Sequence, residues 1–152
     1  SAPMSQTINE AGIDLIKEFE GCKLTAYQDV KGIWTIGVGH IRGVTQGMQI
    51  TMAQADQFLR DDLAGAEAAV NRGVGSAPTT PNQFAAMVSL CFNIGSGGFA
   101  DSTVLRQHRA GHFQAAADAF LMWNKATING VLQPVAGLTR RRTAEKDLYV
   151  KP

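Results

Sequence analysis

The longest amphipathic stripe in the chain follows a helix-capping sequence. Thr51 and Gln54 are spaced as a capping box. Behind them, apolar residues recur every three or four positions up to the sequence "NRGVG"; they are Ala55, Phe58, Leu59, Leu63, Ala66 and Val70. This pattern predicts a helix over about 51–73, roughly 30 Å long at 1.5 Å per residue. A helix of that length is long enough to link two lobes.

The segment before this helix changes from a helical to a strand period. Thr7 and Glu10 are spaced as another capping box, and apolar residues follow at helical spacing until Gly21. They predict a helix over about 8–20. From Leu24 to Val38 the side chains alternate on either side of "DVKG", which predicts a small β-hairpin with a turn at these four residues. Because two strands alone are marginally stable, the hairpin is expected to pack on a helix.

The segment after the long helix reads as all-helical. In "NQFAAMVSLCFNIG" apolar residues cover most of the helix surface, which is typical of a core helix. Three shorter helices are predicted behind it, separated by Gly111 and by "INGVLQPVAG", over about 102–110, 113–125 and 138–149.

These predictions give one α+β domain, mainly α, over residues 1–152. We expect a small lobe with the hairpin at about 8–50, a linking helix at about 51–73, and a helical lobe at about 79–150. A chain of 152 residues is long enough to bury a core in this way, but a separate substrate domain is not expected.

Composition narrows the classes of function. A formal charge of +1 provides no chain-wide attraction to nucleic acid. No run approaches the roughly 18 apolar residues of a membrane span, and "SAPMSQTINE" lacks the features of a signal peptide. The two cysteines are expected to be reduced, and Gly111 interrupts the one histidine pair at helical spacing, His108 and His112. We therefore expect no metal, no cofactor and no stable membrane anchor.

The segment "FEGCKLTAYQDVKGIWTIGVGH" carries two carboxylates of interest. Glu20 continues the apolar stripe of Ile13 and Ile16 at the end of the first helix. We expect it to be partly desolvated near the negative end of the helix dipole, and both effects would raise its pKa. This environment suits a general acid. The alternative is an acid that borders the core and reaches water or an arginine.

The second carboxylate, Asp29, opens "DVKG", where an Asp commonly hydrogen-bonds its own backbone. Taken together, however, a protonated acid and an ionised carboxylate are what hydrolysis of a glycosidic bond requires. Thr35 lies on the strand after the turn. It is either a β-branched strand residue or a hydroxyl that holds a water molecule beside Asp29.

These residues carry a family resemblance. A helix-terminal Glu in "FEG", an Asp nine residues later in "AYQD" and a Thr six further on in "WTIGVGH" resemble the phage-type lysozymes, or endolysins, of glycoside hydrolase family 24. The likeness extends through "NQFAAMVSLCFNIGSGGFADSTVL", "FLMWNKA" and "GLTRRRTAE". It implies a lysozyme-like fold over essentially the whole chain.

The resemblance also implies roles for individual residues. Glu20 would donate the proton, and Asp29 and Thr35 would assist the attack of water. The candidates for contact with the saccharide are His40, Ile41, Phe92, Asn93 and Ser102, although we expect His40 mainly to brace the hairpin by hydrogen bonds. The sequence "AAAD" at 115–118 departs from family members with a substrate-facing Asn there, so no role is assigned to it.

The function expected from this resemblance is a muramidase that cleaves the β-1,4 bond between N-acetylmuramic acid and N-acetylglucosamine in bacterial peptidoglycan. Its action would lyse the host and release phage. We expect a monomer without cofactor, held in the host cytoplasm and released to the periplasm at lysis through a separate pore. The alternatives are a lytic transglycosylase, against which Asp29 and Thr35 argue, a zinc amidase, which lacks ligands, and a non-catalytic wall-binding module.

A further alternative is a cationic protein that disturbs membranes through its arginine-rich end. Arg140, Arg141 and Arg142 are consecutive, and side chains of consecutive helical residues point about 100° apart. They form either a solvated helix face or a set in which one arginine pairs with Glu20 or with anionic wall polymer.

Overall fold

The computed structural model describes residues 5–152; residues 1–4, part of the amino-terminal stretch discussed above, lie outside it. The described chain is mainly helical, with two separate two-stranded antiparallel sheets, which confirms the α+β class. It forms two units. One is Ile16–Ala64, and the other combines the described part of Ser1–Leu15 with Gly65–Pro152. The boundaries fall inside α1 (Glu10–Glu20) and α2 (Met52–Val74), so each of these helices contributes to both units.

Helix α1 begins at a different cap from the one predicted. The Oδ1 atom of Asn9 accepts a hydrogen bond from the backbone N–H of Gly12 at 3.0 Å, so Asn9 is the N-cap. The Thr7 capping box and the start near residue 8 are therefore wrong by about two residues. The end is as predicted, because Gly21 adopts a φ of +76° and donates its N–H to Lys17 O at 2.9 Å.

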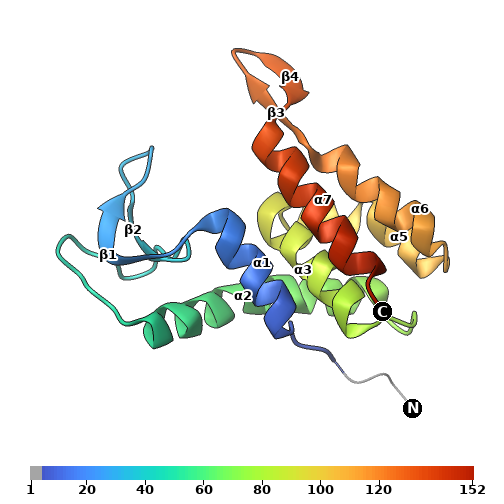
Figure 1. Ribbon diagram of the computed structural model, residues 1–152, viewed down its shortest axis with the longest axis horizontal. Coiled ribbons are helices and arrows are strands. Elements are labelled where there is room, and N and C mark those ends of the chain that lie inside the picture. The colour runs from blue at the N-terminus through green and yellow to red at the C-terminus, as the bar shows by residue number, and fades with distance from the viewer. Residues whose placement is uncertain (1–4) are drawn as a thin grey trace. The chain divides into compact units, whose positions relative to one another are not determined.

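The predicted hairpin is present in the unit Ile16–Ala64. Strands β1 (Lys23–Gln28) and β2 (Trp34–Gly37) pair antiparallel (Figure 1), with Tyr27 opposite Thr35. One face packs on a small hydrophobic core that includes the first turn of α2; its buried members are Ile36, Val44, Ile50 and Ala55. The hairpin thus rests on a helix, as its size requires.

The long helix is α2, one residue displaced from the predicted range of 51–73. Its capping box is confirmed in both directions, because Thr51 N–H donates to Gln54 Oε1 at 2.8 Å and Gln54 N–H donates to Thr51 Oγ1 at 3.1 Å. Most of the predicted stripe is buried: Ala55, Leu59, Leu63, Ala66 and Val70.

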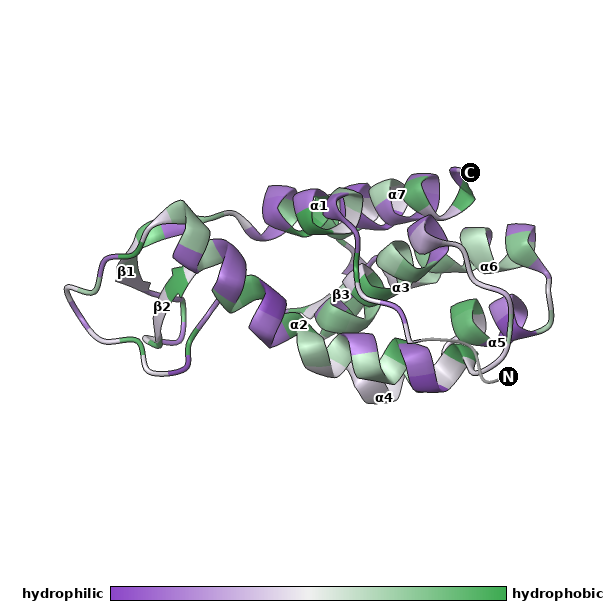
Figure 2. Ribbon diagram, turned by 90° about the horizontal axis from the view of Figure 1, so that it is seen from below, coloured by the Kyte–Doolittle hydropathy of each residue, from purple (hydrophilic) through white to green (hydrophobic). Residues whose placement is uncertain are grey.

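The second unit is built around α3 (Pro81–Ile94), the predicted core helix. A capping box from Thr80 to Gln83 begins it, with Pro81 in the first turn. The other helices of the unit are α4 (Ser96–Ala100), α5 (Thr103–Arg109), α6 (Phe113–Ala119) and α7 (Ala136–Val150). Helix α7 packs along α3 (Figure 1). Coloured by hydropathy, α3 is mostly green, whereas α7 carries long purple stretches (Figure 2).

The sequence did not predict the second hairpin. The helix expected over 113–125 ends at Ala119, and a 3₁₀ turn, η1 (Phe120–Trp123), leads into β3 (Lys125–Ile128) and β4 (Val131–Pro134). Asn129 and Gly130 connect these strands with φ angles of 51° and 79°, which is the conformation of a two-residue hairpin turn. The short helix α4 was also not predicted.

The amino-terminal segment is held by hydrogen bonds within the second unit. Gln6 accepts one from the side chain of Asn71 and donates its backbone N–H to the same side chain, both at 3.0 Å. Ile8 N–H donates to Glu67 Oε2 at 2.8 Å. The unit is therefore assembled from both ends of the described chain. None of the helices in residues 5–152 is long and apolar enough to cross a bilayer.

Candidate active site

Glu20 is the last residue of α1. Its Oε2 atom lies 4.0 Å from the position that a Cβ on Gly39 would occupy, so the carboxylate lies over a residue without a side chain. The Glu20 residue is exposed, so it is less buried than its place on the apolar stripe of the helix predicts.

Asp29 closes the turn between β1 and β2. Its Oδ1 atom accepts the backbone N–H groups of Lys31 at 2.8 Å and Ile33 at 2.9 Å. Its own backbone N–H donates to Ile33 O, and its carbonyl accepts from Gly32 N–H, both at 2.9 Å. The turn-forming role predicted for Asp29 is confirmed. Within the described chain, no hydrogen bond to its Oδ2 atom is found, so one carboxylate oxygen is fixed and the other is open to a further partner.

Hydrogen bonds to the backbone of Ile33 link Thr35 to Asp29. Its side chain is buried, with 3% of the residue exposed, and its hydroxyl donates to Ile33 O at 3.0 Å. The same carbonyl oxygen accepts the N–H of Asp29. Because Ile33 N–H donates to the Asp29 carboxylate, the backbone of Ile33 fixes both side chains relative to each other.

His40 joins the turn after β2 to helix α2. The backbones of His40 and Ile36 exchange two hydrogen bonds, at 2.9 and 3.0 Å. The His40 ring has its Nδ1 atom 2.8 Å from Asp62 Oδ2 and stacks on Phe58 with a centroid separation of 4.2 Å. It therefore braces the hairpin by hydrogen bonds. The next residue, Ile41, is 54% exposed.

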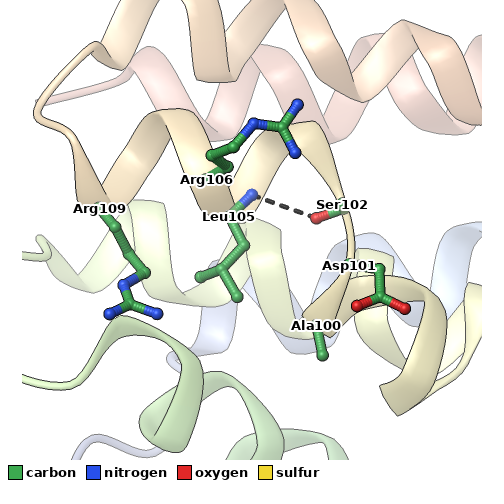
Figure 3. Close-up of a pocket in the computed structure, with 6 residues that line it drawn as sticks. All are labelled: Ala100, Asp101, Ser102, Leu105, Arg106 and Arg109. Carbon is green, nitrogen blue, oxygen red and sulfur yellow. Dashed lines mark hydrogen bonds between the residues drawn. The ribbon is translucent and has the colours of Figure 1, made fainter.

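The remaining candidates belong to the other unit. Phe92 is half-buried and Asn93 is exposed in the last turn of α3. Ser102 is the N-cap of α5, where its hydroxyl accepts from Leu105 N–H at 3.1 Å (Figure 3) and donates to Phe99 O at 2.7 Å. The structure thus brings Glu20, Asp29, Thr35, His40 and Ile41 together in one unit, and Phe92, Asn93 and Ser102 in the second.

Ser102 also borders a surface cavity of about 360 Å³. The cavity is lined by Ala100, Asp101, Ser102, Leu105, Arg106 and Arg109. The guanidinium groups of Arg106 and Arg109 point in different directions (Figure 3), and Arg106 donates to Thr103 Oγ1 at 2.9 Å. The two arginines therefore do not converge on one anionic group.

The arginine-rich segment of α7 differs from the predicted solvated face. Arg140 is exposed, but Arg141 and Arg142 are buried around Glu145. Glu145 Oε2 accepts from Ser89 Oγ at 2.5 Å, from Arg142 Nη2 at 3.1 Å and from Arg141 Nε at 3.3 Å. Burial raises the pKa of Glu145, and the two arginines oppose this shift. The i, i+3 and i, i+4 spacing of the arginines to Glu145 was a signal that sequence reasoning missed.

The histidines at 108 and 112 do not share a site. Helix α5 ends before Gly111, which has a φ of +78°, and the exposed His112 contacts Gln107 at 2.9 Å. The buried His108 bridges Tyr149 Oη at 2.6 Å and Thr79 Oγ1 at 2.8 Å, and burial lowers its pKa. In residues 5–152 no group of three or more His, Cys, Asp or Glu side chains is placed to hold a metal.

The chain is similar to known proteins in sequence and in fold. The family model for phage lysozyme matches residues 17–145. An endolysin of Acyrthosiphon pisum secondary endosymbiont phage 1 is 44% identical over 142 residues, covering 93% of this chain and 97% of that protein. The muramidase domain of SpmX from Asticaccaulis excentricus has a TM-score of 0.89 at 44% identity, with 97% of this chain and 99% of that one covered.

A second solved structure also has a similar fold. The endolysin from Escherichia coli O157:H7 phage FAHEc1 has a TM-score of 0.90 at 42% identity and covers 97% of this chain and 95% of its own. These matches confirm the lysozyme-like fold and the assignment to the glycoside hydrolases that act as endolysins on cell walls. With its family model matched from residue 17 to residue 145, the chain belongs to the phage lysozyme family.

Proposed function

We propose that this endolysin is a muramidase that hydrolyses the β-1,4 bond between N-acetylmuramic acid and N-acetylglucosamine in bacterial peptidoglycan. Glu20 is the general acid, and Asp29 and Thr35 assist the attack of water. The observation that carries the proposal is that all three side chains belong to one unit, in which local hydrogen bonds fix Asp29 and Thr35.

Glu20 suits proton donation to the bridging oxygen because of its position. It ends a helix and is exposed, and its carboxylate lies near the backbone of Gly39. A saccharide is bulky, so its glycosidic oxygen must come within about 3 Å of the acid without a clash. The bare backbone at Gly39 leaves room for that approach.

Asp29 and Thr35 suit the second task, which is to assist the attack of water on the sugar. The turn holds Asp29 Oδ1 by two backbone N–H groups, which leaves Oδ2 to orient a water molecule or to stabilise positive charge at the sugar. Thr35 Oγ1 donates to Ile33 O, so its lone pairs remain for a hydrogen bond from that water. Because the turn is held internally, little reorganisation is needed at the moment of reaction.

The saccharide contacts are proposed from the family likeness. Ile41, Phe92 and Asn93 are at least partly exposed and present apolar and amide groups. Ser102 would contribute to saccharide binding indirectly, by capping α5. His40 would contribute by holding the turn after β2 in place through its contact with Asp62.

The biological setting is also part of the proposal. We infer that residues 1–152 act as one lysozyme domain, with a small lobe at about 8–50, a linking helix at about 51–73 and a helical lobe at about 79–150. The monomeric enzyme is held in the host cytoplasm, reaches the periplasm at lysis and degrades the wall so that phage are released. Acid and water-activating groups both come from the protein, so this reaction needs no cofactor.

Mass spectrometry of the soluble products from purified peptidoglycan tests the reaction. Wild type is expected to release muropeptides with reducing ends, and Glu20→Gln to release at least a hundredfold less. Glu18→Gln is the matched control, because Glu18 is an exposed acid two residues earlier on the same helix and should retain activity.

Other outcomes identify the alternatives. Anhydro products would indicate a lytic transglycosylase. Binding to the wall without glycan cleavage would indicate a wall-binding module, and killing that persists in Glu20→Gln would indicate a membrane-active protein. Equal loss of activity in the Glu18 and Glu20 variants would remove Glu20 from the proposed role.

A further inference from the structure

The hairpin β3–β4 presents an exposed apolar tip in the second unit. Ile128 is 44% exposed, Val131 58% and Leu132 65%; these three residues are called the hairpin tip below. Across the described chain, no other helix or strand packs extensively against either strand. The hairpin projects beyond the amino-terminal end of α7, away from α5 and α6 (Figure 1). Exposed aliphatic residues grouped in this way commonly mark an interaction surface.

Both faces of the tip are apolar. Ile128 and Val131 are directly paired, so their side chains share one face of the hairpin. Leu132 pairs with Thr127, and these two share the opposite face. A folded protein docked on the hairpin would cover one face and leave the other exposed. An environment that surrounds the tip would bury both.

The sequence around the hairpin carries charges of one sign only. Residues 119–144 contain no Asp or Glu. Of the cations in this stretch, Arg141 and Arg142 are buried with Glu145, whereas Lys125 and Arg140 are exposed. Among the described residues, neither Lys125 nor Arg140 forms an ion pair with a carboxylate. Lys125 begins β3, and Arg140 lies in the first turns of α7, shortly after β4.

The base of the hairpin is fixed. Val135 N–H donates to Asn124 O at 2.9 Å, and Asn124 Nδ2 donates to Thr139 Oγ1 at 3.2 Å. Arg142 Nη1 is 3.4 Å from Trp123 O. The tip and its flanking cations are therefore presented by a firmly attached support.

From these observations we propose that the hairpin is a membrane-contact site for anionic phospholipid. The hairpin tip enters the boundary between headgroups and acyl chains, and Lys125 and Arg140 contact the lipid phosphates. The apolar surface on both faces favours a bilayer over a flat protein partner. The segment "KATINGVLQP" has no aromatic ring to stack on a sugar, which favours lipid over wall glycan. The inference does not depend on the proposed reaction.

Co-sedimentation with phospholipid vesicles tests the site. The full chain is expected to bind phosphatidylglycerol vesicles, to bind phosphatidylcholine vesicles weakly, and to lose binding as salt is raised. The double variant Val131→Ser/Leu132→Ser should bind phosphatidylglycerol about tenfold or more weakly. Lys125→Gln and Arg140→Gln should each reduce binding about fivefold. Val150→Ser is the matched control, since Val150 is 52% exposed elsewhere in the same unit.

The same variants separate the other occupants. The tip variant should degrade lipid-free peptidoglycan at the wild-type rate. The sedimentation coefficient of the variant protein should equal that of wild type. Absence of vesicle binding by wild type would overturn the proposal, as would equal effects of the tip and Val150 substitutions. Loss of activity on lipid-free wall would assign the tip to the wall instead, and a change in oligomeric state would assign it to a second copy. Because the charge variants leave the tip intact, they test the site even if the tip variant folds poorly.

Discussion

The Nε atom of Arg142 lies 2.7 Å from Oε1 of Glu145, and neither side chain has exposed surface. Burial lowers the pKa of Arg142 and raises that of Glu145, because both charged forms lose hydration. Their mutual attraction opposes both shifts, and the hydroxyl of Ser89 also opposes that of Glu145. Since Ser89 is on α3 and the charged pair is on α7, the network fixes one core helix of the second unit against the other.

Removing the carboxylate of Glu145 should therefore lower the free energy of unfolding strongly. Glu145→Ala leaves two buried guanidinium groups without their shared acceptor, and we expect a loss of about 3–5 kcal/mol in the free energy of unfolding. Urea denaturation measures it. Asp147→Ala, which removes an exposed acid from the same helix, should change stability by less than about 0.5 kcal/mol. Similar midpoints for the two variants would show that the network does not stabilise the fold.

The turn role and the catalytic role of Asp29 can be separated by two substitutions. Asp29→Asn keeps a side-chain oxygen that accepts from Lys31 and Ile33 but removes the charge. We expect near-wild-type melting and a loss of activity of about 10²-fold or more. Asp29→Ala should lose the same activity and also about 1–3 kcal/mol of stability, because the turn N–H groups lose their acceptor. Wild-type activity in Asp29→Asn would assign Asp29 to the turn alone.

Gly39 and Gly43 offer a matched test of the backbone beneath Glu20. Both have a φ of +71°, but a Cβ on Gly39 would lie 4.0 Å from Glu20 Oε2, whereas a Cβ on Gly43 would meet nothing within 4 Å. Alanine at either position should cost about 1–2 kcal/mol of stability through the left-handed backbone. Only Gly39→Ala should lower turnover of peptidoglycan strongly. If the Gly43 variant loses as much activity at equal stability, the position of Glu20 over Gly39 is not important for the reaction.

His108 should make stability depend on pH. Burial lowers its pKa below the usual 6.5, so the unfolded chain binds the proton more readily than the folded chain. The stabilisation is complete above pH 6.5 and decreases as the pH falls below that value, through the folded-state pKa.

Thermal melting of wild type between about pH 7.5 and 5.5, compared with His108→Gln and His112→Gln, measures this effect. The His108 variant should show a flatter pH dependence in that range. The His112 variant should follow wild type, because His112 is exposed. A wild-type slope in His108→Gln would mean that other groups cause the dependence.

The sequence predicted the caps and turns that are formed by hydrogen bonds between residues close together in the chain. The Thr51–Gln54 box and the DVKG turn depend on hydrogen bonds between neighbours in sequence, and both were predicted. The cap of α1 was not, because Asn9 lies between Thr7 and Glu10 and matches an N-cap equally well. The second hairpin was missed although Asn129–Gly130 is a strong turn signal; its strands carry little alternation of apolar and polar residues.

The features that could not be predicted depend on residues far apart in the chain. The spacing of Arg141 and Arg142 to Glu145 could have indicated their pairing, but the burial of this group could not be predicted, because Ser89, which also holds Glu145, lies more than fifty residues earlier. Glu20 was placed partly in the interior by its helical phase, but it is exposed, and Gly39, which has no side chain, lies near its carboxylate. Helical phase gives the direction of a side chain and says nothing about the size of its neighbour.

The division of the chain has a consequence for synthesis on the ribosome. Ile16–Ala64 is one continuous stretch, so the unit that contains Glu20, Asp29 and Thr35 has all its residues available early in translation. The second unit needs the segment before residue 16, which hydrogen-bonds to α2, and also α7 at the opposite end of the sequence. Its core can be completed only after α7 has left the exit tunnel, so all residues of the first unit are available before the second unit can complete its core.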